Sequence, residues 1–388
     1  MKKDVHHHEQ TYKNWRERVL EEGVEGISKA NSKLYLQFIF DMENGENVSA
    51  KNKKGKRGYG RLNVLRQKLK RVIEMLEDEK INDVTKTTSK KIHKVFNDIS
   101  EGKIRRLDTG EPITYISDYV ANFKAFWHWW MKINRKKGKT IEDITEDLSV
   151  APPKVKFVYI SKENVDKILP YFNEEQQVLV KFLFDSIIRF PTECLSLQVK
   201  DIYEKNGEVW VNIPDEVSKT YGRTFNLLYC GDALKEYIKK NNLKPEDRLF
   251  GVNYLRFTQK LKKVALQVLG DSISHPTAQG RFSELTGYDF RHSGAIHLRQ
   301  LAQRTNISLD AIRQRGGWTD FVMLNYYTQF LGLTGEIRKE DLLISEDKTR
   351  LEKEIEKLKQ QRKEDLKIMK KTVKGIIEGK ISVSTLSN

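Results

Sequence analysis

The residue types best suited to chemistry gather in one stretch near the carboxyl end, from Gly287 to Leu333. Within it Arg291 precedes Trp318, and Tyr327 follows that tryptophan after nine residues. Apolar residues recur at helical spacing after Arg291, which predicts a helix that begins just before it. Free N–H groups at a helix start favour a bound phosphate, so Arg291 is a candidate for holding one. A buried aromatic pair on a helix is the structural alternative for Trp318 and Tyr327.

Two more helices are needed to position these residues. Ser308 is a suitable N-cap for a helix that runs to Gln314, and the paired glycines at 316 and 317 should end that helix. The segment that follows is amphipathic and carries Tyr327.

Two further candidates lie upstream. Arg189 follows a predicted helix from Glu174 to Ile188, and Glu193 stands four residues after that arginine. Lys219 lies between residues 209–213 and 223–228, which alternate at period two and should pair as β-strands. Solvated surface roles, at a helix end and in a turn, are the alternatives for Arg189 and Lys219.

The composition points to a polyanionic partner. The 388 residues include 70 Lys and Arg against 54 Asp and Glu, a formal net charge of +16. Two cysteines provide neither a disulfide framework nor a zinc cluster. We expect a cytoplasmic protein, because no apolar run approaches the ~18 residues of a membrane span and the amino terminus lacks a signal-peptide core. Its basic charge favours association with DNA. No metal or other cofactor is expected.

The chain length and pattern changes indicate two domains and a tail. Residues 1–148 are predicted to be helical, residues 149–158 with Pro152 and Pro153 to be an extended linker, residues 159–335 to combine helices with a short sheet, and residues 336–388 to form a charged helical tail. The expected fold class is mainly α with a small antiparallel β-sheet. One helix is expected from Ile113 to Lys139, with Trp127 and Trp130 on its buried face and Trp129 elsewhere.

One stretch of 21 residues in the first domain contains ten basic residues and no acidic one. Such a one-signed segment repels itself unless an anion neutralises it, so DNA phosphates are its expected counterions. A solvated helix face is the alternative. The ten residues are Lys51, Lys53, Lys54, Lys56, Arg57, Arg61, Arg66, Lys68, Lys70 and Arg71.

Together these motifs resemble the tyrosine recombinase, or phage integrase, family. The family's second motif is His-x-x-Arg, and its third is Gly-His or Gly-Trp with the nucleophilic Tyr nine residues later. Arg291, Gly317-Trp318 and Tyr327 occupy these places. The Arg189 segment resembles the first motif, Gly-x-Arg-x-Ser-Glu-Leu, and Lys219-Thr-x-x-Arg resembles the family's β-hairpin lysine. The resemblance implies a helical, SAM-like core-binding domain followed by an α+β catalytic domain.

The resemblance also implies roles for these residues. Tyr327 would attack phosphorus, with Tyr326 as the alternative nucleophile, and Arg189 and Arg291 would bind phosphate oxygens. Trp318 would donate its indole N–H, and Lys219 would protonate the leaving oxygen.

The chain departs from the family pattern in three places, which makes it a divergent member. Ser186 or Ile187 stands where the first motif has Gly, and Glu193 is one residue further from Arg189 than the family's carboxylate. Tyr288 replaces the His of His-x-x-Arg, and a phenol with a pKa near ~10 is a poor base. His292 adjoins Arg291 and is expected only to support the site, so the group that deprotonates the nucleophile stays open.

A protein of this family would cleave and rejoin DNA through a 3′-phosphotyrosine, without metal or ATP. It would act as a tetramer on two duplexes, through a Holliday junction. Resolvase-like, transposase-like and type IB topoisomerase-like enzymes share this chemistry. A catalytically inactive, architectural DNA-binding protein is the alternative from another class.

Overall fold

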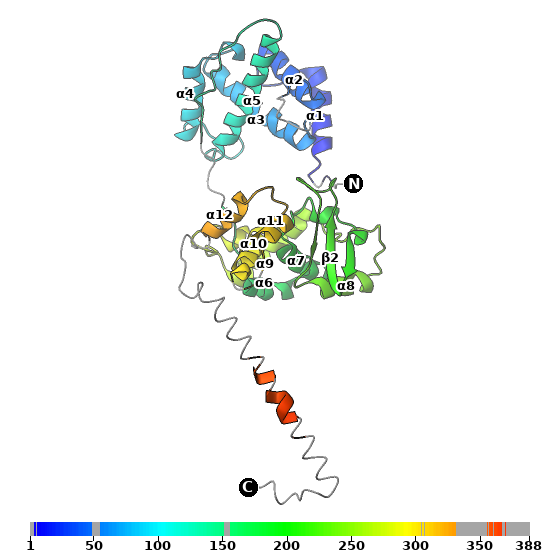
Figure 1. Ribbon diagram of the computed structural model, residues 1–388. Coiled ribbons are helices and arrows are strands. Elements are labelled where there is room, and N and C mark those ends of the chain that lie inside the picture. Colours follow the sequence, from blue (N-terminus) through cyan, green and yellow to red (C-terminus); the bar gives the residue numbers. More distant parts are fainter. Residues whose placement is uncertain are drawn as a thin grey trace, which may run out of the picture. The chain divides into compact units, whose positions relative to one another are not determined.

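The computed structural model describes Asp4 and residues 6–48, 55–150, 156–303, 305, 307–330, 355, 357–359, 361–366 and 369. These residues are mainly helical with a three-stranded antiparallel sheet, which confirms the predicted fold class (Figure 1). Contacts divide the chain into two units, Met1–Tyr327 and Thr328–Asn388. Among the described helices, none is both long and apolar enough to cross a membrane.

Five α-helices lie among the described residues of the amino-terminal part of the chain. Local signals set their ends: the Ser28 side chain accepts a hydrogen bond from the Asn31 N–H, and Gly45 ends the same helix in the left-handed conformation. The helices bury one hydrophobic cluster that extends from Tyr12 to Leu148. They are α1 (His8–Glu22), α2 (Lys29–Asn44), α3 (Tyr59–Asp78), α4 (Ser89–Ser100) and α5 (Ile116–Arg135).

Helix α5 corrects the prediction for its tryptophans. Trp129 is buried together with Trp127, whereas Trp130 is only partly buried. The Trp129 indole N–H donates to Asp41 Oδ2 on α2 at 2.7 Å. This polar partner allows the indole to enter the core, because a buried N–H without an acceptor is costly.

The following part of the chain has its own hydrophobic cluster, which extends from Val158 to Phe290. The sheet order is β1-β2-β3, and the predicted pairing of the second and third strands is confirmed, with Val211 opposite Phe225. Strand β1 was not anticipated. The strands are β1 (Ile202–Lys205), β2 (Glu208–Ile213) and β3 (Arg223–Asn226).

Seven α-helices surround this second cluster or adjoin it in the part of the chain that the structure describes. Helix α7 contacts α8 and α10, and α8 also contacts β2. The helices are α6 (Lys162–Ile168), α7 (Glu174–Ser186), α8 (Gly231–Lys240), α9 (Tyr254–Leu269), α10 (Asp289–Ala302), α11 (Leu309–Gly316) and α12 (Val322–Phe330).

Most of the predicted tail lies outside the described residues. Residues 357–359 and 361–366 are helical, in agreement with the predicted charged helix, and Leu358 and Leu366 are exposed.

Candidate active site

The first group of site residues follows α7. That helix ends at Ser186, two residues earlier than predicted, because Ile187 adopts a left-handed conformation with φ 47°. A β-branched residue rarely adopts positive φ, whereas glycine does so at no steric cost. Of Ser186 and Ile187, the two candidates for the position of the motif's glycine, Ile187 thus has the conformation that glycine adopts most readily. The turn leads directly into Arg189, which brings that arginine back toward the end of α7.

Glu193 contacts Arg189 in spite of its unusual spacing. Its carboxylate accepts hydrogen bonds from the Arg189 side chain at 2.5 Å and from the Arg189 backbone N–H at 3.2 Å. Arg223 on β3 donates to the same carboxylate at 2.7 Å. Burial raises the pKa of Glu193, but the hydrogen bond and charge of Arg223 and the charge of Arg189 lower it to about 2. Glu193 is thus an ionised, buried link between two arginines.

Arg291 is the third residue of α10, as the helical periodicity predicted, and its side chain is buried. Its guanidinium donates to the carbonyl oxygens of Ile187 at 2.6 Å and Gly316 at 2.7 Å, and it lies over the Trp318 ring at 4.9 Å. Burial and the nearby charge of Arg189 lower the pKa of Arg291 to about 10. It stays charged at neutral pH.

Both arginines reach the same backbone turn. Arg189 donates to the carbonyl oxygen of Gly317 at 3.1 Å, and Arg291 donates to that of Gly316. Gly317 ends α11 with φ 62°, and a Cβ there would lie 2.9 Å from the Arg223 guanidinium carbon. The glycine is needed both for its conformation and for space, and the turn aligns two guanidinium groups.

Tyr327 is completely buried beside Trp318, with 5.6 Å between the ring centroids. Its hydroxyl lies 2.9 Å from His292 Nδ1. Burial raises the pKa of Tyr327, partly opposed by Arg291, while burial and the charge of Arg291 lower the pKa of His292 to about 4. At neutral pH a neutral phenol therefore faces a neutral imidazole. His292, which was expected to support the site, thus contacts the Tyr327 hydroxyl directly, because α12 brings Tyr327 to the side of α10 on which His292 lies.

The two other tyrosines lie around this pair. Tyr288 is 41% exposed, and its ring meets the His292 ring edge-on at 5.2 Å. Tyr326 is partly buried, with its ring 5.7 Å from that of Tyr327. Tyr327 contacts both Trp318 and His292.

Lys219 lies in the connection between β2 and β3, and its side chain is exposed. The residues on either side of Lys219 contact the candidate site. Ser218 Oγ donates to Glu193 at 3.4 Å, and Thr220 Oγ1 donates to the Gly317 carbonyl at 2.9 Å. The backbone at Lys219 is therefore fixed beside the arginines, whereas its ammonium group extends into solvent.

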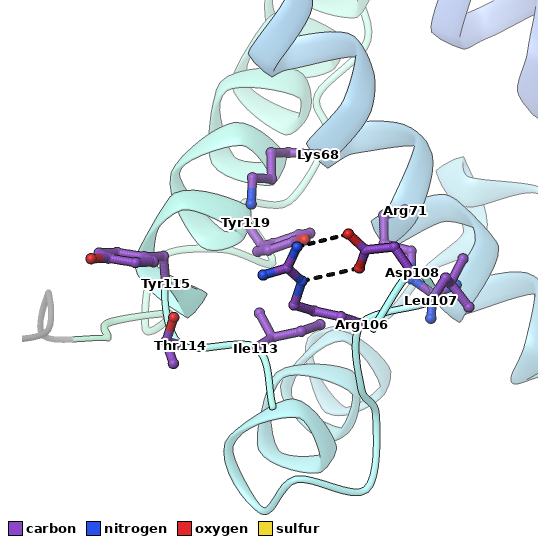
Figure 2. Close-up of a pocket in the computed structure, with 9 residues that line it drawn as sticks. All are labelled: Lys68, Arg71, Arg106, Leu107, Asp108, Ile113, Thr114, Tyr115 and Tyr119. Atoms are coloured by element: carbon purple, nitrogen blue, oxygen red, sulfur yellow. Dashed lines mark hydrogen bonds and ion pairs between the residues drawn. The ribbon is translucent and has the colours of Figure 1, made fainter. Parts of the chain in front are cut away.

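The basic side chains of the stretch from Lys51 to Arg71 differ in exposure and in their contacts. Lys56 and Arg61 are exposed and Arg57 is partly exposed. Arg66 instead lies over the Trp15 ring at 4.9 Å and donates to Asn63. Lys68 lies over the Tyr119 ring (Figure 2), and Lys70 and Arg71 share Glu74, whereas Lys51, Lys53 and Lys54 lie outside the described residues.

The sequence did not single out Arg223 or Arg315. Arg223 is the arginine of the Lys-Thr-x-x-Arg motif, so that motif held the signal for its role. Arg315 ends α11 and makes a buried ion pair with Asp185 at 2.6 Å, a partner 130 residues away in sequence that no local pattern indicates.

The segment before α6 is fastened to α10 next to the candidate site. The Val158 N–H donates to Asp289 Oδ1 at 2.9 Å, and the Ile160 N–H donates to Ser293 Oγ at 3.0 Å. The Phe157 ring lies 4.8 Å from that of His292.

Comparison with known proteins identifies the class of this region. Residues 158–331 match the model of the phage integrase family. This part of the chain is thus similar to the phage integrase family, in agreement with the family suggested by the motifs. No curated protein is similar to the chain in sequence.

Three of the solved structures that match the chain do so at low sequence identity and with TM-scores below 0.5. XerH site-specific recombinase bound to its difH substrate is 14% identical over 80% of this chain and 93% of that one, with a TM-score of 0.49. The Tn1549 transposon integrase in complex with transposon right end DNA is 13% identical over 81% and 98%, with a TM-score of 0.48. A lambda integrase dimer bound to a COC′ core site is 13% identical over 87% and 99%, with a TM-score of 0.45.

Proposed function

We propose that this protein is a site-specific DNA recombinase that cleaves and rejoins DNA through a 3′-phosphotyrosine. The observation that carries the proposal is the shared turn at Gly316 and Gly317. Two arginines distant in sequence donate to its neighbouring carbonyls, and Trp318, the next residue, contacts both Arg291 and Tyr327. Two cations and a phenol around one turn suit a phosphodiester substrate.

The arginines supply charge where the reaction needs it. A guanidinium has five donors, and Arg189 and Arg291 each use part of theirs on Glu193 or backbone carbonyls, which fixes their planes. The remaining donors serve the non-bridging oxygens of the scissile phosphate. Negative charge on these oxygens grows as the phosphorus becomes pentavalent, so fixed cations stabilise that state more than the ground state.

The covalent step exchanges one phosphate ester for another. The Tyr327 oxygen forms a bond to phosphorus, and the bond from phosphorus to the 5′-oxygen breaks with its electron pair on that oxygen. Lys219 gives the leaving oxygen a proton, and the phenol proton passes to a base. The 3′-phosphotyrosine retains the ester bond, so a 5′-hydroxyl can reverse the step without ATP.

His292 is the base in this proposal. It stands 2.9 Å from the Tyr327 hydroxyl, whereas Tyr288, at the place of the family's histidine, is itself a phenol. The buried pair represents a resting arrangement, because the phenol must be exposed to meet a phosphate. A bound phosphate offsets the charge of Arg291, which is one cause of the low His292 pKa, and so makes the imidazole more basic when substrate is present.

The domain division and the assembly are part of the same proposal. Residues 1–148 would bind duplex DNA, 149–158 would link them to a catalytic domain over 159–335, and 336–388 would form a tail. Strand exchange by this chemistry needs four cleaved strands, hence a tetramer on two duplexes and a Holliday junction. The protein would work on DNA in the cytoplasm.

Covalent trapping tests the proposal. The substrates are duplexes from a genomic library, each with a nick close to a possible cleavage point. Cleavage then releases a short fragment that diffuses away, so the strand cannot be rejoined and the covalent protein–DNA complex accumulates. Denaturing gels separate this complex from free DNA. We expect an adduct with the parent and with Tyr326→Phe, and none with Tyr327→Phe. Sequencing the trapped ends then gives the target site.

The outcomes separate the alternatives. If Tyr326→Phe loses the adduct and Tyr327→Phe keeps it, Tyr326 is the nucleophile and Tyr327 is not. Equal DNA binding without adduct in all three proteins would favour an architectural DNA-binding protein. Joining of strands from two different sites distinguishes a recombinase from a topoisomerase-like enzyme.

A further inference from the structure

Two hydroxyl groups next to Lys219 attach the connection between β2 and β3 to the turn that follows α11. Thr220 Oγ1 donates to the Gly317 carbonyl oxygen at 2.9 Å, and the Tyr221 hydroxyl donates to the Trp318 carbonyl oxygen at 2.9 Å. Each of these hydrogen bonds joins residues that lie 97 positions apart in the sequence. The connection is therefore held by the same turn to which the two arginines of the candidate site donate.

Both of these carbonyl oxygens also accept a hydrogen bond from an arginine. Arg189 donates to the Gly317 carbonyl at 3.1 Å, and Arg313 donates to the Trp318 carbonyl at 3.0 Å. A carbonyl oxygen has two lone pairs, so it can accept from a hydroxyl and from a guanidinium at the same time. The Thr220 hydroxyl and the Arg189 guanidinium thus share one acceptor atom, which fixes the β2–β3 connection relative to that arginine.

The β2–β3 connection is also closed on itself. The Gly222 N–H donates to Asp215 Oδ1 at 2.5 Å. A Cβ at Gly222 would lie 2.9 Å from the carbonyl oxygen of Ile213, which is too close a contact for a side chain, so glycine is needed where the two ends of the connection meet. Because the connection is closed in this way, a hydrogen bond at Tyr221 also restrains the backbone of Lys219.

Lys219 depends on this restraint because its side chain is exposed. A lysine ammonium sits on a flexible four-carbon stem, so its position is set by the backbone from which the stem extends. An acid must come within hydrogen-bonding reach of the oxygen that it protonates. A loosened backbone would spread the ammonium over a larger volume and would lower the fraction of time that it spends within reach.

We infer that Thr220 and Tyr221 are positioning residues for the proton that Lys219 gives to the leaving 5′-oxygen. The inference rests on the proposed function, in which Lys219 is the acid. It adds two side chains that act through the backbone of Lys219, by holding it against the turn at Gly317 and Trp318.

A substrate whose leaving atom needs no proton tests the inference. The substrate is the nicked duplex that forms an adduct with the parent, made with either oxygen or sulfur as the 5′-bridging atom of the cleaved bond. In both forms the Tyr327 oxygen bonds to phosphorus, and the bond from phosphorus to the 5′-atom breaks with its electron pair on that atom. A thiol has a pKa near ~8.5, far below that of an alcohol, so sulfur leaves as a thiolate without an acid.

Tyr221→Phe and Thr220→Val each remove one hydroxyl and keep the shape of the side chain. Each should slow single-turnover cleavage of the oxygen substrate about tenfold, because one hydrogen bond that holds Lys219 is lost. On the sulfur substrate each should cleave within about twofold of the parent rate, because the acid is no longer needed. Lys219→Ala should show the same recovery on sulfur and is the positive control.

Two variants on the same sheet are matched controls. Tyr203→Phe removes the hydroxyl of an exposed tyrosine on β1, and Thr224→Val removes a hydroxyl on β3 that donates to Asn212 at 3.2 Å. Both changes leave the hydrogen bonds to the turn in place, so both variants should cleave the oxygen and sulfur substrates at the parent rate. Thermal unfolding shows that each variant is folded.

A double variant gives a second measurement. If Tyr221 acts through Lys219, adding Tyr221→Phe to Lys219→Ala should slow cleavage of the oxygen substrate no further. Independent effects would instead multiply, and the double variant would be slower than Lys219→Ala by about another tenfold.

Three results would overturn the inference. Equal slowing of Tyr221→Phe and Thr220→Val on oxygen and sulfur would give these residues a general structural role. Parent rates on both substrates would show that the two hydroxyls are not needed. Independent effects of Tyr221→Phe and Lys219→Ala would separate Tyr221 from the acid. In each case a normal adduct with the parent leaves the proposed function standing, whereas the absence of any adduct with the parent would remove both.

Discussion

Two buried carboxylates lie on either side of the turn that follows α7, and they have opposite tasks. Asp185 pairs with Arg315 and accepts hydrogen bonds from the backbone N–H groups of residues 228, 229 and 230. Glu193 pairs instead with Arg189 and Arg223. Asp185 thus fixes the chain between β3 and α8, whereas Glu193 fixes an arginine of the candidate site. Burial and pairing alone do not distinguish a structural acid from one that serves catalysis.

The largest effect is expected for Glu193→Gln. The amide cannot compensate the charges of both arginines, so the free energy of unfolding should fall by about 3 kcal/mol. DNA cleavage should fall by about 10²- to 10³-fold as well, because Arg189 loses the group that orients it. Urea unfolding and single-turnover cleavage of a nicked duplex measure the two losses. Cleavage at the parent rate would contradict a role for Glu193 in the site.

Asp185→Asn should lower the stability by a similar amount, about 3 kcal/mol, since it leaves Arg315 buried without a counterion. Cleavage by the folded fraction should stay within a few-fold of the parent. The measurement is the same pair of assays, with cleavage done well below the melting temperature. A loss of cleavage as large as that of Glu193→Gln would remove the distinction between the two acids.

Lowering the pH should remove the stabilisation that the Glu193 carboxylate contributes to the folded protein. Its pKa is about 2 in the folded protein and lies below the ordinary value of 4.5, so its stabilisation is complete above about pH 4.5 and is lost as the pH falls toward 2. At neutral pH the contribution is worth about 3 kcal/mol. The difference in unfolding free energy between the parent and Glu193→Gln should therefore shrink across this window. If the difference in unfolding free energy does not change with pH, the negative charge of Glu193 does not stabilise the folded protein.

The smallest effect is expected for an exposed pair. Glu204→Gln on β1 breaks the contact with Lys235, whose side chain is 41% exposed. Water already solvates both groups, so neither the melting temperature nor cleavage should change measurably. A change as large as that of Asp185→Asn would mean that burial is not what separates the strong pairs from the weak ones.

The sequence predicted the elements whose signals are local. Ser308 caps α11 and Gly317 ends it, α9 spans the expected residues, and the second and third strands pair as their alternation indicated. Caps, glycines and periodicity act within a few residues, so they can be recognised without the fold.

The sequence could not predict contacts between distant elements. The orientation of His292 was judged from its own helix, but its partner Tyr327 arrives on α12, 35 residues later. Arg315 and Asp185, like Trp129 and Asp41, satisfy each other across elements that only the tertiary fold brings together. A buried polar group needs a hydrogen-bonding partner, but the sequence alone does not reveal which residue that partner is.

The attachment of residues 157–160 to α10 places this segment in direct contact with the candidate site. Asp289 and Ser293 hold this segment from positions on either side of Arg291 and His292, and Phe157 packs on the imidazole itself. Any displacement of the Phe157 ring would therefore act first on the imidazole that lies 2.9 Å from the Tyr327 hydroxyl.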